Sequence, residues 1–574
     1  MFSVEEASDC QAEWTIPVEL GHIDVLGGGF LSALSANVLA NSDFFIGAFP
    51  AEYSNAVSGV FDMRLRNGNN EKFQHTFQLG MLGIDFASEG PISRENNSSY
   101  IFNYRYSTTA LLAKLQRNKN MGGTLGYQDL NFKLNFPTPK AGTFSLWGTG
   151  LIDEVKPSLE KENEQKYLDE GILSSANQKS GAMGLSHRYF FKNYKTSLKT
   201  TLATTHLGNH ISEEFRDLNE NRSPRTDMTS NTTNLVFTSA LTHQFSPGHT
   251  NKTGRPLENF NNASGNTNLI TAYTQSLINV TDGLTLSAGL NVQHLSLNGK
   301  TSIEPRATLK WQTNDQNSLA LGYGLHSRME KADVYFVKDV NGNLANKNLN
   351  FTKNNMNLKV EPYFQSLYDV PVSETGSYSI LNRKDFYITQ SLVSEGKGKN
   401  YGVDITFSKY LTNGNVLYAD TSLFQSRYQS AERHWFDTRY NRRFVANGLI
   451  GKEWMLDRNM LSVNLKLTTM GGQRYTPVDK AATLAHPDKE VQYDESRQFS
   501  EQFSPMFIGD FSISYKMNRR KTAHTFSLKS VNATRQKEYL KHKYNIITEN
   551  IEPVYSTNSL FNVSSKIDFN FRNL

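Results

Sequence analysis

The sequence contains no run of roughly 20 consecutive apolar residues, which is the length that a membrane-spanning helix needs. It contains only one cysteine, Cys10, so an internal disulfide framework and a CxxC metal site are both excluded. Glu5, Glu6 and Asp9 stand where an apolar run would precede a lipid-anchored cysteine. The same acidic start lacks the basic and apolar regions of a signal peptide. We therefore expect the natural N-terminus to lie upstream of Met1.

A dominant charge of one sign is also missing. The net charge is +5, from 60 Lys and Arg against 55 Asp and Glu, with no basic tail or stripe. This pattern argues against nucleic acid as a partner. The mean hydropathy of −0.52 does not exclude a membrane protein, because a membrane-spanning strand turns only alternate residues to lipid. The 26 Tyr and 35 Phe are a high number, typical of proteins that build aromatic girdles.

No group of residues indicates catalysis. The sequence shows no Ser-His-acid set and no paired carboxylates at the ends of the expected strands. The most closely spaced histidines, His206 and His210, lie at the rim of an expected strand, where single histidines are commoner than a metal pair. Gly27–Gly29 is followed by no Lys-Ser/Thr, so a turn is a better interpretation than a phosphate loop. We predict a non-enzyme without catalytic, cofactor-binding or metal-binding residues.

From about residue 73 onward, apolar and polar residues alternate with a period of two, which indicates strands with one apolar and one polar face. Tyr100, Phe102, Tyr104 and Tyr106 alternate with Asn103, Arg105 and Ser107. The same alternation occurs in Leu130–Phe136, Tyr401–Ser408, Leu461–Thr468 and Phe507–Lys516. A soluble β-sandwich would show this alternation too, so further features must decide between the two architectures.

Three features favour a transmembrane barrel. The expected strands are roughly 10 to 15 residues long, whereas soluble strands peak near 5 or 6. Short turns alternate with long polar loops, as in outer-membrane barrels. The polar faces carry charges in mid-strand that a dry core would exclude, at Arg105, Lys133, Asp404, Lys466 and Asp510. The short turns are 138–142, 192–193, 281–283, 313–317, 412–414, 457–459 and 518–521, and the long loops lie near 153–179, 209–232, 330–356, 371–397, 471–501 and 537–555.

The number of expected strands indicates the class of barrel. About twenty strands can be placed, from a first hairpin (Phe73–Leu79 and Gly83–Pro91) to a last strand, Asn562–Phe571. Barrels of 16 to 18 strands leave an aqueous channel, whereas those near 22 hold a plug. The sequence therefore predicts an all-β chain, a transmembrane antiparallel β-barrel of about 20–22 strands over residues 70–574.

Residues 23–69 do not alternate and are rich in small residues, as in Ser32-Ala33-Leu34-Ser35-Ala36-Asn37. With the phrases Asn41–Tyr53 and Gly59–Gly68, this segment resembles the second half of the plug domain of TonB-dependent receptors. The resemblance is closest to a group from Bacteroidota-like bacteria with a carboxypeptidase-regulatory-like module ahead of the plug. Further phrases resemble that family in the expected order: Glu89–Ile92, Tyr104–Thr108, Glu304–Arg306, Leu367–Pro371 and Gly471–Pro477.

The chain also departs from that family. The resemblance implies a signal peptide, a β-sandwich module, a TonB-contacting segment and a first half-plug, none of which this sequence supplies. Residues 1–22 match nothing and stay unassigned, and 23–69 is expected to be the C-terminal half of the plug. After Thr250–Gly254 and after Phe351–Asn355 the family usually supplies one more strand. Either the barrel closes with about twenty strands, or its wall has gaps with unpaired edges, which lipid does not tolerate.

The resemblance implies a cell-outer-membrane receptor that imports a nutrient such as a siderophore or glycan, driven by a TonB-type motor. Because the motor-contacting segment is missing, we expect that this chain alone is not energised. A passive, partly plugged pore and a non-transporting surface-binding barrel are the alternatives. Expected partners are outer-membrane lipid and lipopolysaccharide, and a surface lipoprotein is left open. Glu52 and either Arg64 or Arg66 are candidate plug–wall contacts, whereas ligand-binding residues are unknown.

Overall fold

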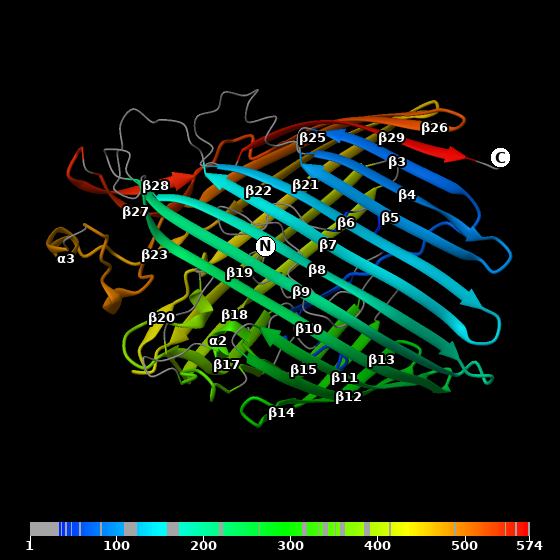
Figure 1. Cartoon of the computed structure of the whole chain (residues 1–574), viewed down its shortest axis with the longest axis horizontal. Coiled ribbons are helices and arrows are strands. Elements are labelled where there is room, and N and C mark those ends of the chain that lie inside the picture. The colour runs from blue at the N-terminus through cyan, green and yellow to red at the C-terminus, as the bar shows by residue number, and fades with distance from the viewer. Residues whose placement is uncertain are drawn as a thin grey trace.

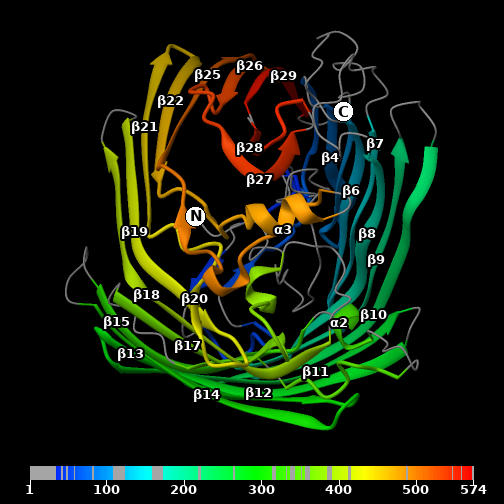
Figure 2. The ribbon, with the colours of Figure 1, turned by 90° about the vertical axis from the view of Figure 1, so that its left-hand side faces the viewer.

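The computed structural model is one large antiparallel barrel with loops gathered at one end and an inner segment inside it (Figures 1 and 2). The residues that the structure describes are 34–35, 37–40, 43–46, 49–56, 59–80, 83–107, 123–157, 172–216, 222–262, 265–312, 318–330, 332–336, 343–350, 352–355, 362–383, 391–411, 415–486, 489–545, 547–556 and 559–571. No helix within these residues is long and apolar enough to cross a membrane.

The barrel wall is one ring of paired strands, in which β29 pairs with β3 over Ser564–Phe571 and Phe73–Gly80. The first half of the ring is β3 (Phe73–Gly80), β4 (Gly83–Ser93), β5 (Ser98–Ser107), β6 (Gly123–Thr138), β7 (Gly142–Pro157), β8 (Ile172–Phe190), β9 (Thr196–Arg216), β10 (Arg222–Ser246), β11 (His249–Asn262), β12 (Gly265–Thr281), β13 (Leu284–Leu295) and β14 (Lys300–Gln312). The second half is β15 (Ser318–Arg328), β16 (Thr352–Asn355), β17 (Pro362–Ser373), β18 (Leu392–Leu411), β19 (Asn415–Gln429), β20 (Trp435–Asp437), β21 (Phe444–Leu456), β22 (Asn459–Met470), β25 (Met506–Asn518), β26 (Thr522–Val531) and β29 (Leu560–Phe571).

The remaining elements lie inside the ring or in the loops. A two-stranded sheet, β1 (Asp43–Ile46) and β2 (Gly59–Asp62), belongs to the inner segment. The long loops contain α2 (Ala332–Tyr335), η2 (Ile380–Asn382), β23 (Arg474–Tyr475), α3 (Lys480–Ala485), η3 (Glu495–Arg497), β24 (Glu501–Gln502), β27 (Glu538–Asn545) and β28 (Asn550–Ser556).

The described part of the ring contains 23 strands. Because β20 and β21 pair with the same edge of β19, at residues 427–429 and 415–423, 22 strands cross its circumference. This number is the upper end of the predicted range, and it is the size at which barrels hold a plug. The predicted all-β barrel is confirmed.

One of the two predicted wall gaps is wrong. At the first site β11 is a full strand of 14 residues that pairs with β10 and β12. The sequence hid it because its outward positions include Thr253 and Arg255, so no apolar alternation marks it. At the second site β16 has only four residues, so the barrel wall is short along the strand direction there. β18 continues over Asp404–Leu411 beyond the partner of Pro362, and among the described residues only β19 pairs with that stretch.

The apolar residues of the alternating pattern face outward and the polar residues face inward, as predicted. Tyr104 and Tyr106 are exposed on the outer surface, whereas Asn103, Asn131 and Lys133 between these rows are buried. The exposed outward positions include many large apolar residues, and many of the buried inward positions are polar. A lipid-facing exterior and a polar interior explain this arrangement.

Short turns and long loops lie at opposite ends of the barrel (Figure 1). Turns at 139–141, 191–195, 282–283, 457–458 and 519–521 agree with the prediction, while 313–317 and 412–414 lie outside the described residues. Two predicted loops are corrected. Residues 209–232 are mostly the extended ends of β9 and β10, and 537–555 contains the hairpin β27–β28. The sequence did not reveal these strands because most of their residues are polar, and main-chain pairing between strands needs no apolar side chain.

Candidate functional site

The inner segment, residues 34–69, lies within the ring and is tied together by main-chain contacts (Figure 2). Ala40 donates its amide to the Arg64 carbonyl at 2.7 Å, and Arg66 donates to the Val38 carbonyl at 2.9 Å. Leu34, Val38 and Leu65 pack in one buried cluster with wall residues that include Ile101 and Trp147. The segment therefore presents an apolar face to strands β5 to β10.

A first polar anchor lies where the inner segment passes into the barrel. Arg66 makes a bidentate ion pair with Glu89 of β4, with both nitrogen–oxygen distances 2.7 Å. The Asn69 amide donates to the same carboxylate at 2.8 Å, and Arg66 also donates to the Asn37 carbonyl at 3.0 and 2.8 Å. Bidentate geometry of this kind adds orientation as well as energy. The predicted contact of Arg66 with the wall is confirmed, whereas Arg64 pairs with Asp62 inside the segment.

Charges in mid-strand serve the same segment. The Lys133 ammonium of β6 donates to the Leu65 carbonyl at 2.7 Å, and Asp85 of β4 accepts from Ser35 at 3.5 Å and Asn37 at 3.4 Å. These inward charges are stable because they satisfy polar groups of the inner segment, which a plain apolar core would not allow.

A second polar anchor is the group of contacts between wall strands and the tip of the inner segment, residues 49–55. The Ala51 amide donates to Gln275 of β12, and Asn291 of β13 donates to the Ala51 carbonyl, both at 2.7 Å. Glu52 forms an ion pair with Lys252 of β11, as the sequence predicts for Glu52. The Met329 amide, directly after β15, donates to the Asn55 side chain at 2.8 Å. Main-chain and side-chain groups of the tip are thus held by three or more wall strands.

Arg306 of β14 is the centre of this anchor. It donates to the Pro50 carbonyl at 2.8 Å and to the Tyr53 carbonyl at 2.5 Å, and it pairs with Glu304 at 2.6 Å. The side chains of Arg306 and Glu304 are 3% and 0% exposed, so this ion pair is dry. The Phe49 ring lies 4.7 Å from the Arg306 guanidinium. The Glu304-Pro305-Arg306 phrase and the Phe49–Tyr53 phrase therefore meet in space.

The surroundings of Arg306 are buried and polar. Glu304 also accepts from Gln293 at 2.7 Å and from Ser327. The His326 ring lies against the Phe49 ring in a tilted arrangement, with ring centroids 4.0 Å apart. His326 is fully buried, and within the described residues neither of its ring nitrogens has a hydrogen-bond partner. Sequence reasoning missed His326 and Gln293. The only signal for them was their inward position on alternating strands.

Tyr53 and Asp62 add a buried contact inside the segment. The Tyr53 hydroxyl donates to Asp62 at 2.9 Å. Burial, and then the neighbouring Glu52 and Asp62 carboxylates, raise the pKa of Tyr53, so it stays a neutral donor.

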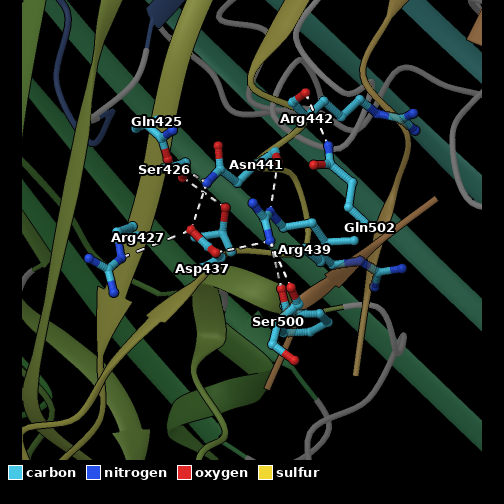
Figure 3. A network of polar contacts seen from close by, with 12 residues as sticks. Gln425, Ser426, Arg427, Asp437, Arg439, Asn441, Arg442, Ser500 and Gln502 are labelled. Atoms are coloured by element: carbon cyan, nitrogen blue, oxygen red, sulfur yellow. Dashed lines mark hydrogen bonds and ion pairs between the residues drawn. The ribbon is translucent and has the colours of Figure 1, made fainter. Parts of the chain in front are cut away.

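In the outer loops (residues 430–443, 471–505 and 532–559) a second polar centre forms around Arg474, and Figure 3 shows its partners Asp437, Asn441 and Ser500. Arg474 donates to the Asn441 carbonyl at 3.0 Å and to the Phe499 and Ser500 carbonyls at 3.1 and 3.3 Å. It also pairs with Asp437 at 3.0 Å. This arginine joins residues 437–441 of one loop to residues 499–500 of its own loop.

The Gly471–Pro477 phrase is explained by close packing. A Cβ on Gly471 would lie 1.7 Å from the Arg442 carbonyl oxygen, and one on Gly472 would lie 2.0 Å from that of Phe503. Only glycine fits at such approaches. The two glycines bring the chain near enough for Arg474 to reach the carbonyls of its neighbours.

An aromatic cluster joins the hairpin β27–β28 to the 471–505 loop. Phe503 lies 4.3 Å from both Tyr475 and Tyr539, measured between ring centroids. The hydroxyl of Tyr539 and Nδ1 of His542 lie 2.8 Å apart. Burial lowers the pKa of His542, which favours its neutral ring.

Several residues considered from the sequence are not brought together. His206 and His210 both lie on β9, where four residues of rise separate them by roughly 13 Å. Each lies 2.9 Å from a threonine hydroxyl instead, and no group of three His, Cys, Asp or Glu in the described ranges could hold a metal ion. Residues 1–22 with Cys10, and Gly27–Gly29, lie outside the described residues.

Comparisons with known proteins bear on the fold. No protein-family model matches the sequence, and no curated protein matches it. Solved structures do match: the ferripyoverdine receptor of the Pseudomonas aeruginosa outer membrane has a TM-score of 0.66 at 13% identity, covering 98% of this chain and 80% of that one. The siderophore receptor PirA from Acinetobacter baumannii gives 0.65 at 13% identity, covering 96% and 88%.

A third match is a mutant of the ferric enterobactin receptor PfeA from Pseudomonas aeruginosa, with a TM-score of 0.64 at 12% identity, covering 94% of this chain and 86% of that one. These neighbours are receptors by name, and at 12–13% identity they bear on the fold of this chain. The chain has the fold of TonB-dependent outer-membrane receptors.

Proposed function

We propose that this chain is an outer-membrane receptor that imports a nutrient ligand, with residues 23–69 acting as plug and 70–574 as the transmembrane barrel. The observation that carries the proposal is the inner segment, which is held across the ring by the Arg66 and Arg306 anchors. An ordinary pore has no need of such a segment.

The ligand class that we favour is an iron–siderophore complex, with a glycan as the alternative. The neighbouring structures are siderophore receptors by name, and that function is carried here only as part of the proposal. We also propose that a TonB-type motor moves the inner segment when the motor-contacting segment of the family is supplied. Membership of the Bacteroidota-like group, its carboxypeptidase-regulatory-like module and a surface lipoprotein partner remain proposals that rest on the resemblance.

The test is conductance in planar bilayers combined with uptake in cells. The unchanged chain should show little current, because the inner segment obstructs the ring. The double variant Arg66→Ala and Lys133→Ala removes the anchor at the first strands, and frequent large openings are expected. Lys310→Ala, an exposed residue of β14, is the control.

Each outcome separates the candidate functions. A large steady current from the unchanged chain would favour the passive pore. Loss of ferric-siderophore uptake when the motor is deleted would support energised import. Binding of the ligand without any uptake would favour a surface-binding barrel.

A further inference from the structure

The connection between the inner segment and the barrel contains an asparagine followed by a glycine, Asn67-Gly68. In such a pair the backbone nitrogen of the glycine can attack the side-chain amide of the asparagine, because glycine has no side chain to hinder the approach. A succinimide ring forms, and for this reason asparagine is one of the thermolabile residues of proteins. Whether the ring forms in a folded chain depends on the freedom of the two reacting groups.

Both reacting groups of this pair are free of hydrogen bonds. The Asn67 side chain is exposed, and within the residues that the structure describes neither this side chain nor the Gly68 amide has a hydrogen-bond partner. Glycine is required at position 68, because a Cβ there would lie 1.9 Å from the carbonyl oxygen of Tyr100. Close packing therefore demands the residue that leaves Asn67 most reactive.

A second Asn-Gly pair, in the turn between β13 and β14, is held by hydrogen bonds. The Asn298 side chain donates to the carbonyls of Lys347 and Leu349, at 3.1 and 2.7 Å. The Gly299 amide donates to the Leu295 carbonyl at 3.0 Å. These bonds occupy the side chain and the nucleophile, so they must break before the ring can close.

A third Asn-Gly pair lies within a wall strand. Asn447 and Gly448 belong to β21 and pair with β19 on one side and β22 on the other. The Asn447 side chain donates to Asp420 at 2.9 Å and accepts from Thr468 at 2.7 Å. The side chain of this pair is therefore engaged at both its nitrogen and its oxygen.

Asn67 and Gly68 also lie between two groups that bind the same carboxylate. On one side Arg66 makes its bidentate pair with Glu89, and on the other side the Asn69 amide donates to Glu89 at 2.8 Å. An isoaspartate at position 67 would carry the backbone through the former side chain and add one atom to the main chain. The close packing of Gly68 leaves no slack for that atom. The groups on the two sides can then no longer reach the carboxylate together.

We propose that Asn67 is a site of spontaneous deamidation, which releases the first polar anchor as the chain ages. The Gly68 nitrogen forms a bond to Cγ of Asn67, the bond from Cγ to Nδ2 breaks, and the proton of the Gly68 amide leaves with Nδ2 as ammonia. Water then adds to one of the two ring carbonyls and breaks its bond to the Gly68 nitrogen, which takes up a proton. The products are aspartate and isoaspartate. The proposal concerns the anchor alone and holds whether or not the chain imports a ligand.

Peptide mapping by mass spectrometry measures the reaction at all three pairs in one sample of the purified, folded chain, incubated in detergent at mildly alkaline pH. Asn67 should react about tenfold faster than Asn298 and Asn447, because two hydrogen bonds of ordinary net strength lower a reactive population by about that factor. In denaturant the three pairs should react at similar rates, because the hydrogen bonds are lost. Equal rates in the folded chain, or a faster Asn67 that stays faster in denaturant, would overturn the proposed site.

Hydrogen exchange of the peptide that contains Asn69 measures the release of the anchor. The Asn69 amide should exchange faster in the aged chain than in the fresh chain, in proportion to the isoaspartate found at position 67. The matched variant is Asn67→Gln, which removes no contact and whose longer side chain closes a ring far more slowly. Its Asn69 amide should stay protected through the same incubation. An Asn69 amide that keeps its protection after Asn67 is fully modified would refute the release of the anchor.

Discussion

Two buried arginines hold distant segments together in this molecule, and they do so with the same chemistry. Arg306 of the wall binds two carbonyls of the inner segment and the carboxylate of Glu304. Arg474 in the outer loops binds three carbonyls and the carboxylate of Asp437. The difference is the second partner, because Glu304 is fully buried whereas the Asp437 side chain is 23% exposed.

That difference sets how costly each arginine is to remove. A charge left alone in a dry site has no solvent to replace its partner, whereas a partly exposed carboxylate recovers hydration. Removing the arginine at the tip of the inner segment should therefore cost more free energy of unfolding than removing the arginine in the outer loops, whose carboxylate partner is partly hydrated. The comparison teaches that solvent exposure, more than the number of hydrogen bonds, separates the two sites.

The largest expected effect is that of Arg306→Ala. It strands the Glu304 carboxylate in a buried site and releases the carbonyls of Pro50 and Tyr53, so we expect a loss of about 3–5 kcal/mol of unfolding free energy. Chemical denaturation of the folded barrel measures it. Lys310→Ala on the same strand should change the free energy by less than about 0.5 kcal/mol. Equal effects of the two variants would show that Arg306 is not an anchor.

Arg474→Ala should be milder, with a loss of about 1–3 kcal/mol that is confined to the outer loops. Hydrogen exchange of the amides in 437–443 and 498–502 should speed up, while the amides of the inner segment stay protected. Arg474→Lys keeps the charge but loses the planar fork, so it should not restore protection. Arg497→Ala, whose pair with Glu501 is exposed, is the control. Exchange that rises throughout the barrel would contradict the proposed separation of the two regions.

The sequence was sufficient for the architecture because alternation is a local signal. Exposed residues such as Tyr104 and Tyr106 alternate with buried residues such as Asn103, and this alternation indicates which face of a strand meets lipid. The tight turns indicate where each strand ends. It also led to Glu52 and Arg66, since charges in a segment expected inside a polar lumen need wall partners. The strand β11 and the ends of β9 and β10 were not predicted because most of their outward residues are polar.

The centre of each site could not be predicted. Arg306 and Pro50 are 256 positions apart, and no local pattern shows that the curvature of a 22-strand ring brings them to 2.8 Å. Arg474 shares this problem, because its carbonyl partners come from two separate loops. The Gly471 and Gly472 pair signalled a close approach, but not which carbonyls it approaches.

The pH dependence of the outer loops gives a smaller effect. Burial lowers the pKa of His542, so the unfolded histidine binds protons more readily than the folded one. The contribution of a neutral His542 is complete above the unfolded pKa of about 6.5 and is lost as the pH falls below it toward the lowered folded value. Hydrogen exchange of β27, corrected for its intrinsic pH dependence, should therefore rise between neutral and mildly acidic pH.

The charged and titratable groups around His542 are Tyr475, Tyr493, Tyr539 and Lys541, and none of the tyrosines titrates in that range because burial raises the pKa of Tyr475, Tyr493 and Tyr539. His542→Gln should abolish the pH dependence. A pH dependence that survives in this variant would assign the effect to another group.

The smallest expected effect sharpens the contrast within the inner segment itself. The ion pair of Glu52 and Lys252 is partly exposed, with side chains 24% and 33% accessible. Arg306, which binds the carbonyls of Pro50 and Tyr53 in the same tip, is buried. Glu52→Gln should cost no more than about 1 kcal/mol, and the loss should shrink as salt rises, because salt screens exposed charges. The effect of Arg306→Ala should hardly respond to salt, because its partner is dry. Measuring both free energies of unfolding at low and at about 1 M ionic strength tests this directly. If the two variants lose stability in parallel with salt, then burial is not what distinguishes them, and the tip is held by a single solvated network.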